Sequence, residues 1–134
     1  MENFKKLLKK DNFAAYSGIE LLEVSPGHAK TRMKIEEKHL NALRAVQGGA
    51  IFTLADFAFA AASNAYGTAA VGINASISYV KAGKKGILTA EAKETSINPK
   101  LATYTVNITD DEGDLVAIFQ GMVYRKKVPL ELSD

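Results

Sequence analysis

Residues 46–56 read VQGGAIFTLAD, and the alanine-rich stretch FAFAAASNA follows at residues 57–65. From Ala50 to Ala65 the segment contains no glycine or proline, and Tyr66-Gly67 behind it is typical of a helix end. The segment therefore predicts a helix of about 16 residues, roughly 24 Å long. Because apolar side chains surround almost the whole helix, we expect it to be buried, with the rest of the chain packed around it.

Strand patterns lie on both sides of this helix. Before it, residues 18–24 and 28–35 flank the turn signal SPG, which predicts a β-hairpin. After it, four stretches of strand character predict a four-strand meander: residues 69–80, 86–98, 102–109 and 115–125. The order predicts an α+β fold, in which an antiparallel sheet of about six strands wraps around one long central helix.

The chain shows no repeat, low-complexity tract or domain boundary, so we expect a single domain over residues 1–134. Residues 1–13 predict a short amphipathic helix, because apolar residues at helical spacing stand among lysines. Residues 127–134 are expected to form a frayed tail. The short glycine motifs of nucleotide-binding folds are absent from the sequence.

The composition excludes several functional classes. Hydrophobic residues make up 47% and charged residues 24% of the chain, and the net charge of +2 is too small to indicate nucleic-acid binding. The chain has no cysteine, and His28 and His39 lack the spacing of a metal-binding pair, so we expect neither a metal nor a cofactor. No signal-peptide pattern or apolar run of membrane-spanning length occurs, so we expect a cytoplasmic location and no membrane partner.

Asp56 is the one charged side chain within the apolar helix. Thr53 and Ser63 share its face at helical spacing, and this polar stripe begins at Gly48-Gly49. Asp56 lies too deep in the helix to act as an N-cap. Burying an unpaired carboxylate costs several kcal/mol, so such a group is paired, protonated or functional. A hydrogen bond to Thr53 or Ser63, a salt bridge and a catalytic role all remain open.

Gly48 and Gly49 give the stripe a second feature. Two glycines at a helix start leave backbone N–H groups unshielded at the positive end of the helix dipole. Such N–H groups can stabilise negative charge that develops on a carbonyl oxygen. The alternative is steric, since glycines also permit a tight turn and close helix–sheet contact. With Asp56 two turns further on, the stripe combines a base with a candidate oxyanion site.

These residues resemble the PaaI-like group of the hotdog-fold acyl-CoA thioesterases. The family pattern joins an Asn, a His-Gly-Gly and a Leu-Ala-Asp ahead of an alanine-rich helix. Here it reads N41, then Q47-G48-G49, then L54-A55-D56. SISYVKAG at residues 76–83 and VAIFQG at residues 116–121 are also similar to the family, and the resemblance spans roughly residues 15–126. It implies the hotdog fold and hydrolysis of an acyl-CoA thioester.

The resemblance also implies roles for individual residues. Asp56 corresponds to the catalytic carboxylate, which acts as general base on water or attacks the thioester itself. Gly49, or its neighbour Gly48, corresponds to the backbone donor to the thioester carbonyl, and Asn41 to a polar positioning residue. The resemblance implies a homodimer that assembles into a homotetramer, with Asp56 facing Asn41 and Gln47 of a partner subunit.

Substrate contacts are expected from four further residues. Lys81 and Lys84 flank a glycine turn and could attract the phosphates of coenzyme A, which enters only as part of the substrate. Thr53 lies on the polar stripe. Asn74 falls near the strand position where some relatives carry a Ser or Thr beside the attacking water.

The sequence departs from the family pattern at Gln47, which replaces the His and cannot carry a proton. A non-catalytic acyl-CoA binding or sensing protein on the same fold is therefore the alternative. A hydratase ranks last, because His28 and His39 lie outside the spacing that such a reaction needs. The acyl group remains open, since Phe52, Phe57 and Phe59 could line an aromatic or an aliphatic pocket.

Overall fold

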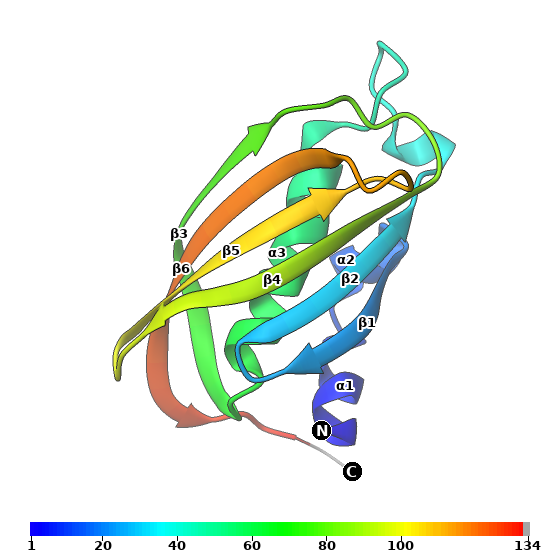
Figure 1. The fold of residues 1–134 in the computed structure, drawn as a ribbon. Coiled ribbons are helices and arrows are strands. Elements are labelled where there is room, and N and C mark those ends of the chain that lie inside the picture. Colours follow the sequence, from blue (N-terminus) through cyan, green and yellow to red (C-terminus); the bar gives the residue numbers. More distant parts are fainter. Residues whose placement is uncertain (133–134) are drawn as a thin grey trace.

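The computed structural model describes residues 1–132. A single antiparallel sheet curves around the long helix α3 (Gly48–Asn64), as Figure 1 shows. Its strands are β1 (Ile19–Ser25), β2 (His28–Lys34), β3 (Thr68–Tyr79), β4 (Ile87–Ile97), β5 (Leu101–Thr109) and β6 (Leu115–Pro129). Two short helices, α1 (Glu2–Leu8) and α2 (Asn12–Tyr16), precede β1, and a 3-10 turn η1 (Glu37–His39) follows β2. The predicted α+β architecture of one sheet around one helix is confirmed.

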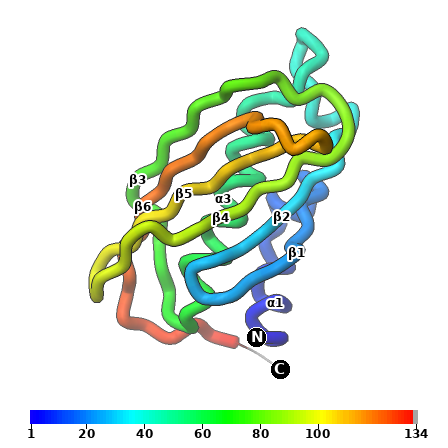
Figure 2. Tube along the Cα trace, in the orientation of Figure 1, coloured from blue at the N-terminus to red at the C-terminus, as the bar shows by residue number. Residues whose placement is uncertain are grey.

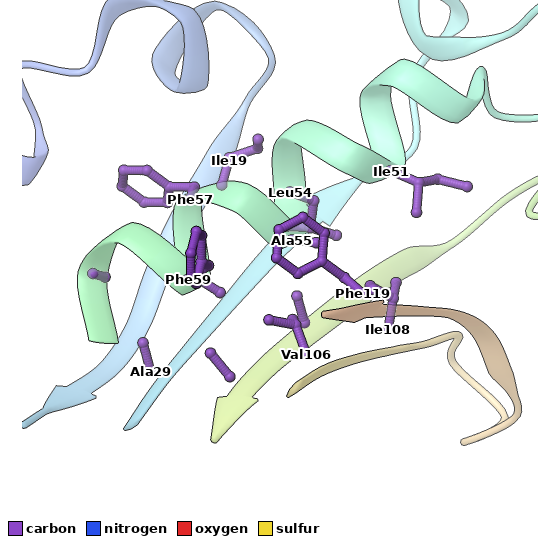
Figure 3. Packing of buried hydrophobic residues seen from close by; sticks show 14 of the residues in the cluster. Ile19, Ala29, Ile51, Leu54, Ala55, Phe57, Phe59, Val106, Ile108 and Phe119 are labelled. Carbon is purple, nitrogen blue, oxygen red and sulfur yellow. The ribbon is translucent and has the colours of Figure 1, made fainter. Parts of the chain in front are cut away.

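Helix α3 packs against the concave face of the sheet through small and aromatic side chains. Its alanines bring the helix backbone close to the strands, and Ala55 and Ala58 have no exposed surface. Phe59 fills the remaining space and contacts Phe119 of β6, with ring centroids 5.4 Å apart (Figure 3). Gly121 of β6 permits this contact, because a Cβ there would lie 2.7 Å from the Phe59 ring.

One stripe of α3 is left uncovered, so the expectation of a helix buried all round is wrong. Gly49 and Asp56 are exposed, and Thr53 and Ala60 between them are half-buried. The sheet curves around only one side of the helix, and α2 borders the stripe beside Gly49 and Thr53 without burying it. Ser63, expected on this stripe, is buried instead and donates its hydroxyl to the Ala60 carbonyl.

The predicted four-strand meander is also wrong, because β3 does not pair with β4. The strand order across the sheet is β1-β2-β4-β5-β6-β3, so only β4, β5 and β6 form a meander and β3 lies at the edge beyond β6. Residues 80–86 are not a hairpin turn. They carry the chain across one end of the sheet, from one edge to its middle (Figure 2). The carbonyl of Gly83 in this connection accepts a hydrogen bond from the N–H of Val46, just before α3.

Both ends of the chain differ from expectation. The predicted helix over residues 1–13 ends at Leu8, and α2 begins anew because the Asp11 carboxylate accepts the N–H of Ala14 at 3.0 Å. The last strand continues to Pro129, which pairs with Thr68, so residues 127–129 are not frayed. The rest of the predicted tail includes residues 133–134, which lie outside the described residues. Within residues 1–132, no helix combines the length and apolarity needed to cross a bilayer.

Candidate active site

The start of α3 is built around Gln47, Gly48 and Gly49. Gln47 is the N-cap residue, and its side-chain Oε1 accepts the backbone N–H of Gly49 at 2.6 Å. Of the two N–H groups expected to be free for substrate, that of Gly49 is therefore occupied in this structure. The N–H of Gly48 makes no hydrogen bond with any other residue in the range 1–132. The Gly48 carbonyl accepts the hydroxyl of Tyr79 from β3 at 2.9 Å, which fixes the helix start to the sheet edge.

The carboxylate of Asp56 has no hydrogen-bond or salt-bridge partner within residues 1–132. The structural explanations expected for it do not apply, because Thr53 donates its hydroxyl to the Gly49 carbonyl and Ser63 donates to Ala60. Desolvation by the surrounding helix raises the pKa of Asp56, and the negative charge of Asp11 on α2 raises it further. Asp56 still keeps an accessible surface on the open stripe of α3, where another molecule can reach it.

Asn41 shapes the loop ahead of α3. Its Oδ1 accepts the backbone N–H groups of Leu43 and Ala45, at 2.9 and 3.2 Å. This loop is closed by a bridge between Leu40 and Val46. No hydrogen bond joins Asn41 to Asp56 in the same chain, so the structure does not bring these two predicted residues together. The side-chain Nδ2 of Asn41 has no partner among the described residues.

Asn74 lies on the wrong face of the sheet for the role expected of it in its own subunit. Its neighbours Ala75 and Ile77 face the other way, and Ile77 packs against the core beneath α3. Asn74 instead lines a polar hollow on the convex face with Ser76 and Gln120. A β-bulge between Gly72 and Asn74 shifts the alternation of side chains along β3, which the sequence pattern did not reveal.

Of the two lysines expected to bind phosphate, only Lys84 is free of acidic partners within residues 1–132. Lys81 forms ion pairs with Asp110 and Asp114 at 2.7 and 2.8 Å, in the turn between β5 and β6. These two carboxylates raise the pKa of Lys81 and neutralise its charge. As placed here, Lys81 closes a turn and does not offer a free cation.

A cavity of about 350 Å³ opens between α2 and the start of α3, and sequence reasoning missed it. Its lining joins Gln47, Gly49 and Thr53 to two aromatic residues of α2. Phe13 and Tyr16 are 68% and 80% exposed there. The i, i+3 spacing of these aromatics behind the cap residue Asp11 was the signal for an aromatic face on a second helix.

Neither histidine is paired with Asp56, because each forms hydrogen bonds elsewhere. His39 is buried, its Nδ1 accepts the N–H of Glu36, and its Nε2 therefore carries the proton donated to the Ser17 carbonyl at 2.7 Å. This neutral tautomer is held by backbone groups on both sides. His28 pairs with Glu91 on β4 at 2.7 Å. Within the described chain, the carboxylate of Asp56 is the one titratable group on the open stripe of α3.

Comparison with known proteins identifies the family. The model of the Thioesterase superfamily matches residues 45–117. A protein of Archaeoglobus fulgidus is 42% identical over 120 residues, which is 89% of this chain and 78% of that protein. The acyl-coenzyme A thioesterase PaaI of Escherichia coli is 31% identical over 125 residues, which is 92% of this chain and 89% of that protein.

Solved structures agree with the sequence comparison. The structure of E. coli PaaI matches with a TM-score of 0.92 at 30% identity, over 97% of this chain and 95% of that one. A hypothetical thioesterase of Streptococcus pneumoniae, solved with coenzyme A, matches with a TM-score of 0.86 at 25% identity, over 93% and 98% of the two chains. Because the family match covers more than half of this chain, and PaaI aligns with nearly all of it, the chain belongs to the thioesterase superfamily and is a hotdog-fold thioesterase of the PaaI-like group.

Proposed function

We propose that this thioesterase hydrolyses an acyl-CoA thioester to a carboxylic acid and free coenzyme A, with Asp56 as the catalytic carboxylate. The observation that carries this proposal is the unpartnered Asp56 on the open stripe of α3, with a pKa raised by desolvation. A raised pKa makes a carboxylate a better proton acceptor. The name of the E. coli relative and the coenzyme A in the S. pneumoniae structure support the substrate class.

Two routes use Asp56. In the first, its carboxylate takes a proton from water while the water oxygen bonds to the thioester carbonyl carbon. The carbonyl oxygen gains negative charge beside the N–H of Gly49 or Gly48, and the C–S bond then breaks to release the coenzyme A thiolate, which takes up a proton. In the second, a carboxylate oxygen attacks the carbonyl carbon, expels the thiolate and leaves an anhydride that water hydrolyses. After turnover in ¹⁸O-labelled water, label in the Asp56 carboxylate supports the second route.

Gly49 and Asp56 of one chain are too far apart to act on the same thioester. Asp56 follows Gly49 by seven positions on α3, which places the two residues about 10 Å apart along the helix axis. A base and an oxyanion donor must both lie within about 3 Å of the reacting atoms. We therefore propose that the N–H donor of one subunit works with Asp56 of another, in a homodimer whose two α3 helices run antiparallel.

The edge strand β3 supports this homodimer. Its outer side has no strand partner within residues 1–132, and it exposes large apolar residues, including Val71 at 40% and Ile73 at 54%. A long apolar edge strand is normally paired or covered in a stable protein. We propose that β3 pairs with β3 of a second copy, and that two such dimers form the expected tetramer.

Mixed subunits test the shared site. Asp56→Ala lacks the base, and the double variant Gly48→Pro/Gly49→Pro lacks both candidate N–H donors, so each variant alone should be inactive. Unfolding and refolding the two together should restore about one quarter of wild-type turnover, because half of the dimers are mixed and each holds one intact site. Each variant refolded alone is the control. Turnover that stays absent in the mixture would place donor and base within one chain.

A second candidate is an acyl-CoA binding protein without turnover, because Gln47 occupies the N–H of Gly49. A turnover screen over short, medium, long and aryl CoA thioesters separates the two candidates. Under the thioesterase proposal, wild type hydrolyses at least one class and Asp56→Asn loses that activity while binding the thioester. Equal rates for wild type and Asp56→Asn would contradict the proposed role of Asp56. The reaction as proposed needs only water and the thioester, with no further cofactor.

A further inference from the structure

The phenylalanines of α3 are not free to hold an acyl group. Phe57 and Phe59 are buried, and both belong to the hydrophobic core (Figure 3). The ring of Phe52 packs edge-on against Phe119 of β6, with ring centroids 5.3 Å apart. An apolar acyl group bound near the start of α3 must therefore contact apolar side chains from another element.

Helix α2 supplies exposed aromatic side chains at this place. Phe13 and Tyr16 line the cavity of about 350 Å³ between α2 and the start of α3, and their exposed fractions are 68% and 80%. A cavity of that size is large enough for a small organic group. Burying an aromatic side chain is favourable, so an aromatic pair left open beside a cavity indicates a surface that another group covers.

The cavity adjoins the candidate oxyanion donors. Gly49, Ala50 and Thr53 line it from the side of α3. The N–H groups of Gly48 and Gly49 are neighbours in the chain, so a thioester carbonyl held by either one lies within about one helical turn of Ala50. The acyl group can then extend into the cavity, while the sulfur on the other side of the carbonyl carbon points away from it. This geometry does not depend on which of the two glycines donates.

A second hollow borders the start of α3 on the opposite side. Its lining includes Gly48, Tyr79 and Val80, and it lies against the edge strand β3. The proposed pairing of β3 with β3 of a second copy would bring another subunit against this side, and the Gly48 carbonyl already binds the Tyr79 hydroxyl. The cavity beside α2 is therefore the better candidate for the acyl group.

Two hydrogen bonds fix the end of α2 that carries Tyr16. The Nζ of Lys38 donates to the Tyr16 carbonyl and the Nε2 of His39 donates to the Ser17 carbonyl, both at 2.7 Å. The carbonyl of His39 in turn accepts the N–H of Gln47, the cap of α3, at 2.7 Å. His39 thus joins the aromatic wall to the start of α3, so the fold itself sets the width of the cavity.

We propose that the cavity between α2 and α3 is the acyl subsite, and that Phe13 and Tyr16 select apolar acyl groups. This inference rests on the proposed thioester hydrolysis. An acyl group that bears a carboxylate is disfavoured. Lys38, the one lysine or arginine that lines the cavity in the described chain, already binds the Tyr16 carbonyl and lies 3.6 Å from the Glu36 carboxylate. The subunit that supplies the N–H donor therefore also supplies the acyl specificity.

Substrate profiles of Phe13→Ala and Tyr16→Ala test the proposal. Each variant should lose roughly 5- to 30-fold in kcat/KM for benzoyl-CoA and hexanoyl-CoA, because it removes apolar contact area from the bound acyl group. The same variants should change less than about 2-fold with acetyl-CoA, whose methyl group reaches little of the aromatic wall. Wild type should hydrolyse adipyl-CoA, which adds a carboxylate to a chain of the same length, less efficiently than hexanoyl-CoA.

Tyr124→Ala is the control, since Tyr124 is a half-exposed tyrosine of β6 that does not line this cavity. It should leave the ratio of benzoyl-CoA to acetyl-CoA turnover unchanged. Equal losses on these two thioesters in Phe13→Ala would overturn the inference, because they would show general damage and not a lost acyl contact. A changed oligomeric state with an unchanged profile, measured by size-exclusion chromatography, would also overturn it and assign the aromatic pair to a subunit contact.

Filling the cavity is a test of the opposite kind. Ala50→Leu adds bulk between α3 and α2 without removing an aromatic side chain. Leucine is a good helix former, so the start of α3 should stay intact. The variant should lose roughly 10-fold or more in kcat/KM for benzoyl-CoA and keep its acetyl-CoA turnover. Preserved benzoyl-CoA turnover would place the acyl group elsewhere and overturn the inference.

Mixed subunits show which chain holds the acyl group. In the mixture of Asp56→Ala with Gly48→Pro/Gly49→Pro, the intact site combines the N–H donor of the first chain with Asp56 of the second. Phe13→Ala added to the Asp56→Ala chain should lower benzoyl-CoA turnover, whereas the same change in the other chain should not. The reverse result would overturn the assignment of the acyl subsite to the donor's subunit.

These outcomes separate the inference from the proposed function. An active wild type whose acyl profile is insensitive to changes at Phe13, Tyr16 and Ala50 would overturn the inference alone. Absence of wild-type turnover on every thioester would overturn the proposed function, and the acyl subsite with it.

Discussion

Tyr79 on the edge strand β3 donates its hydroxyl to the carbonyl oxygen of Gly48 at 2.9 Å, and the two residues touch so closely that a Cβ on Gly48 would lie 3.0 Å from the tyrosine ring. This contact fixes the first turn of α3 against the sheet. The close contact also favours glycine at position 48 on steric grounds, besides any role of its N–H.

Tyr79→Phe should lower the free energy of unfolding by about 0.5–1.5 kcal/mol and reduce kcat/KM, because the helix start loses its only side-chain tie to β3 within the described chain. Urea unfolding and initial rates measure the two effects. Tyr124→Phe is the matched control, since Tyr124 is a half-exposed strand tyrosine without a hydrogen bond in the described residues. Equal losses in both variants would show that the Gly48 contact contributes nothing.

Gly121→Ala should destabilise the fold by about 1–3 kcal/mol, because the new methyl group would overlap the ring of Phe59 at 2.7 Å. Replacing the phenyl ring by a smaller side chain, in the double variant Gly121→Ala/Phe59→Leu, should recover part of that loss. Gly83→Ala is the control, since its nearest neighbours lie at ordinary contact distances of 3.5–3.7 Å. The order of denaturant midpoints checks the prediction. A double variant whose loss of stability exceeds the sum of the two single losses would contradict it.

Asp56→Asn should abolish turnover and at the same time stabilise the protein at neutral pH. The folded pKa of Asp56 is raised, so the folded state binds its proton more tightly than the unfolded chain. Wild type therefore loses stability as pH rises above the unfolded pKa and through the folded one, whereas the asparagine variant does not. Unfolding between pH 3 and 8, at a fixed protein concentration, measures the difference. A stability gap that does not widen with rising pH would contradict a raised pKa.

Asp11→Asn should move the acidic limb of the kcat/KM profile to lower pH. Asp56 must be ionised to act, and the negative charge of Asp11 helps to raise its pKa, so removing that charge lets Asp56 ionise earlier. Asparagine also caps helices, so α2 should remain intact. Glu2→Gln, which removes a charge from α1, is the control. A kcat/KM profile that is unchanged in Asp11→Asn would show that Asp11 does not influence the pKa of Asp56.

Lys84→Met should raise KM for the CoA thioester, and more so at low ionic strength, because Lys84 is an exposed cation without an acidic partner in the described chain. Lys81→Met should lower the Tm with little change in KM, because its charge is already neutralised by Asp110 and Asp114. Rates at two salt concentrations compare the variants. A larger KM effect at Lys81 would mean that the substrate breaks its ion pairs.

The local sequence determined the central helix, the six strands and the single carboxylate of the stripe. These follow from short-range patterns: an alanine-rich run without breakers for α3, and alternation of apolar residues for the strands, as at the buried Ala29, Thr31 and Met33 of β2. The residues 46–56 and the family resemblance also gave the thioesterase class. Element type depends on neighbours in the chain, so the sequence alone contains it.

Contacts between distant residues were decided only by the tertiary structure. The pattern of β3 could not reveal that it pairs with β6 at the sheet edge, because an alternating strand fits several partners. Likewise, Lys81 looked like a free cation until the β5–β6 turn placed two aspartates beside it. Gln47 is a further case. Its position before Gly48-Gly49 was evident in the sequence. The hydrogen bond that its Oε1 accepts from the Gly49 N–H depends on the side-chain rotamer, which only the folded structure specifies.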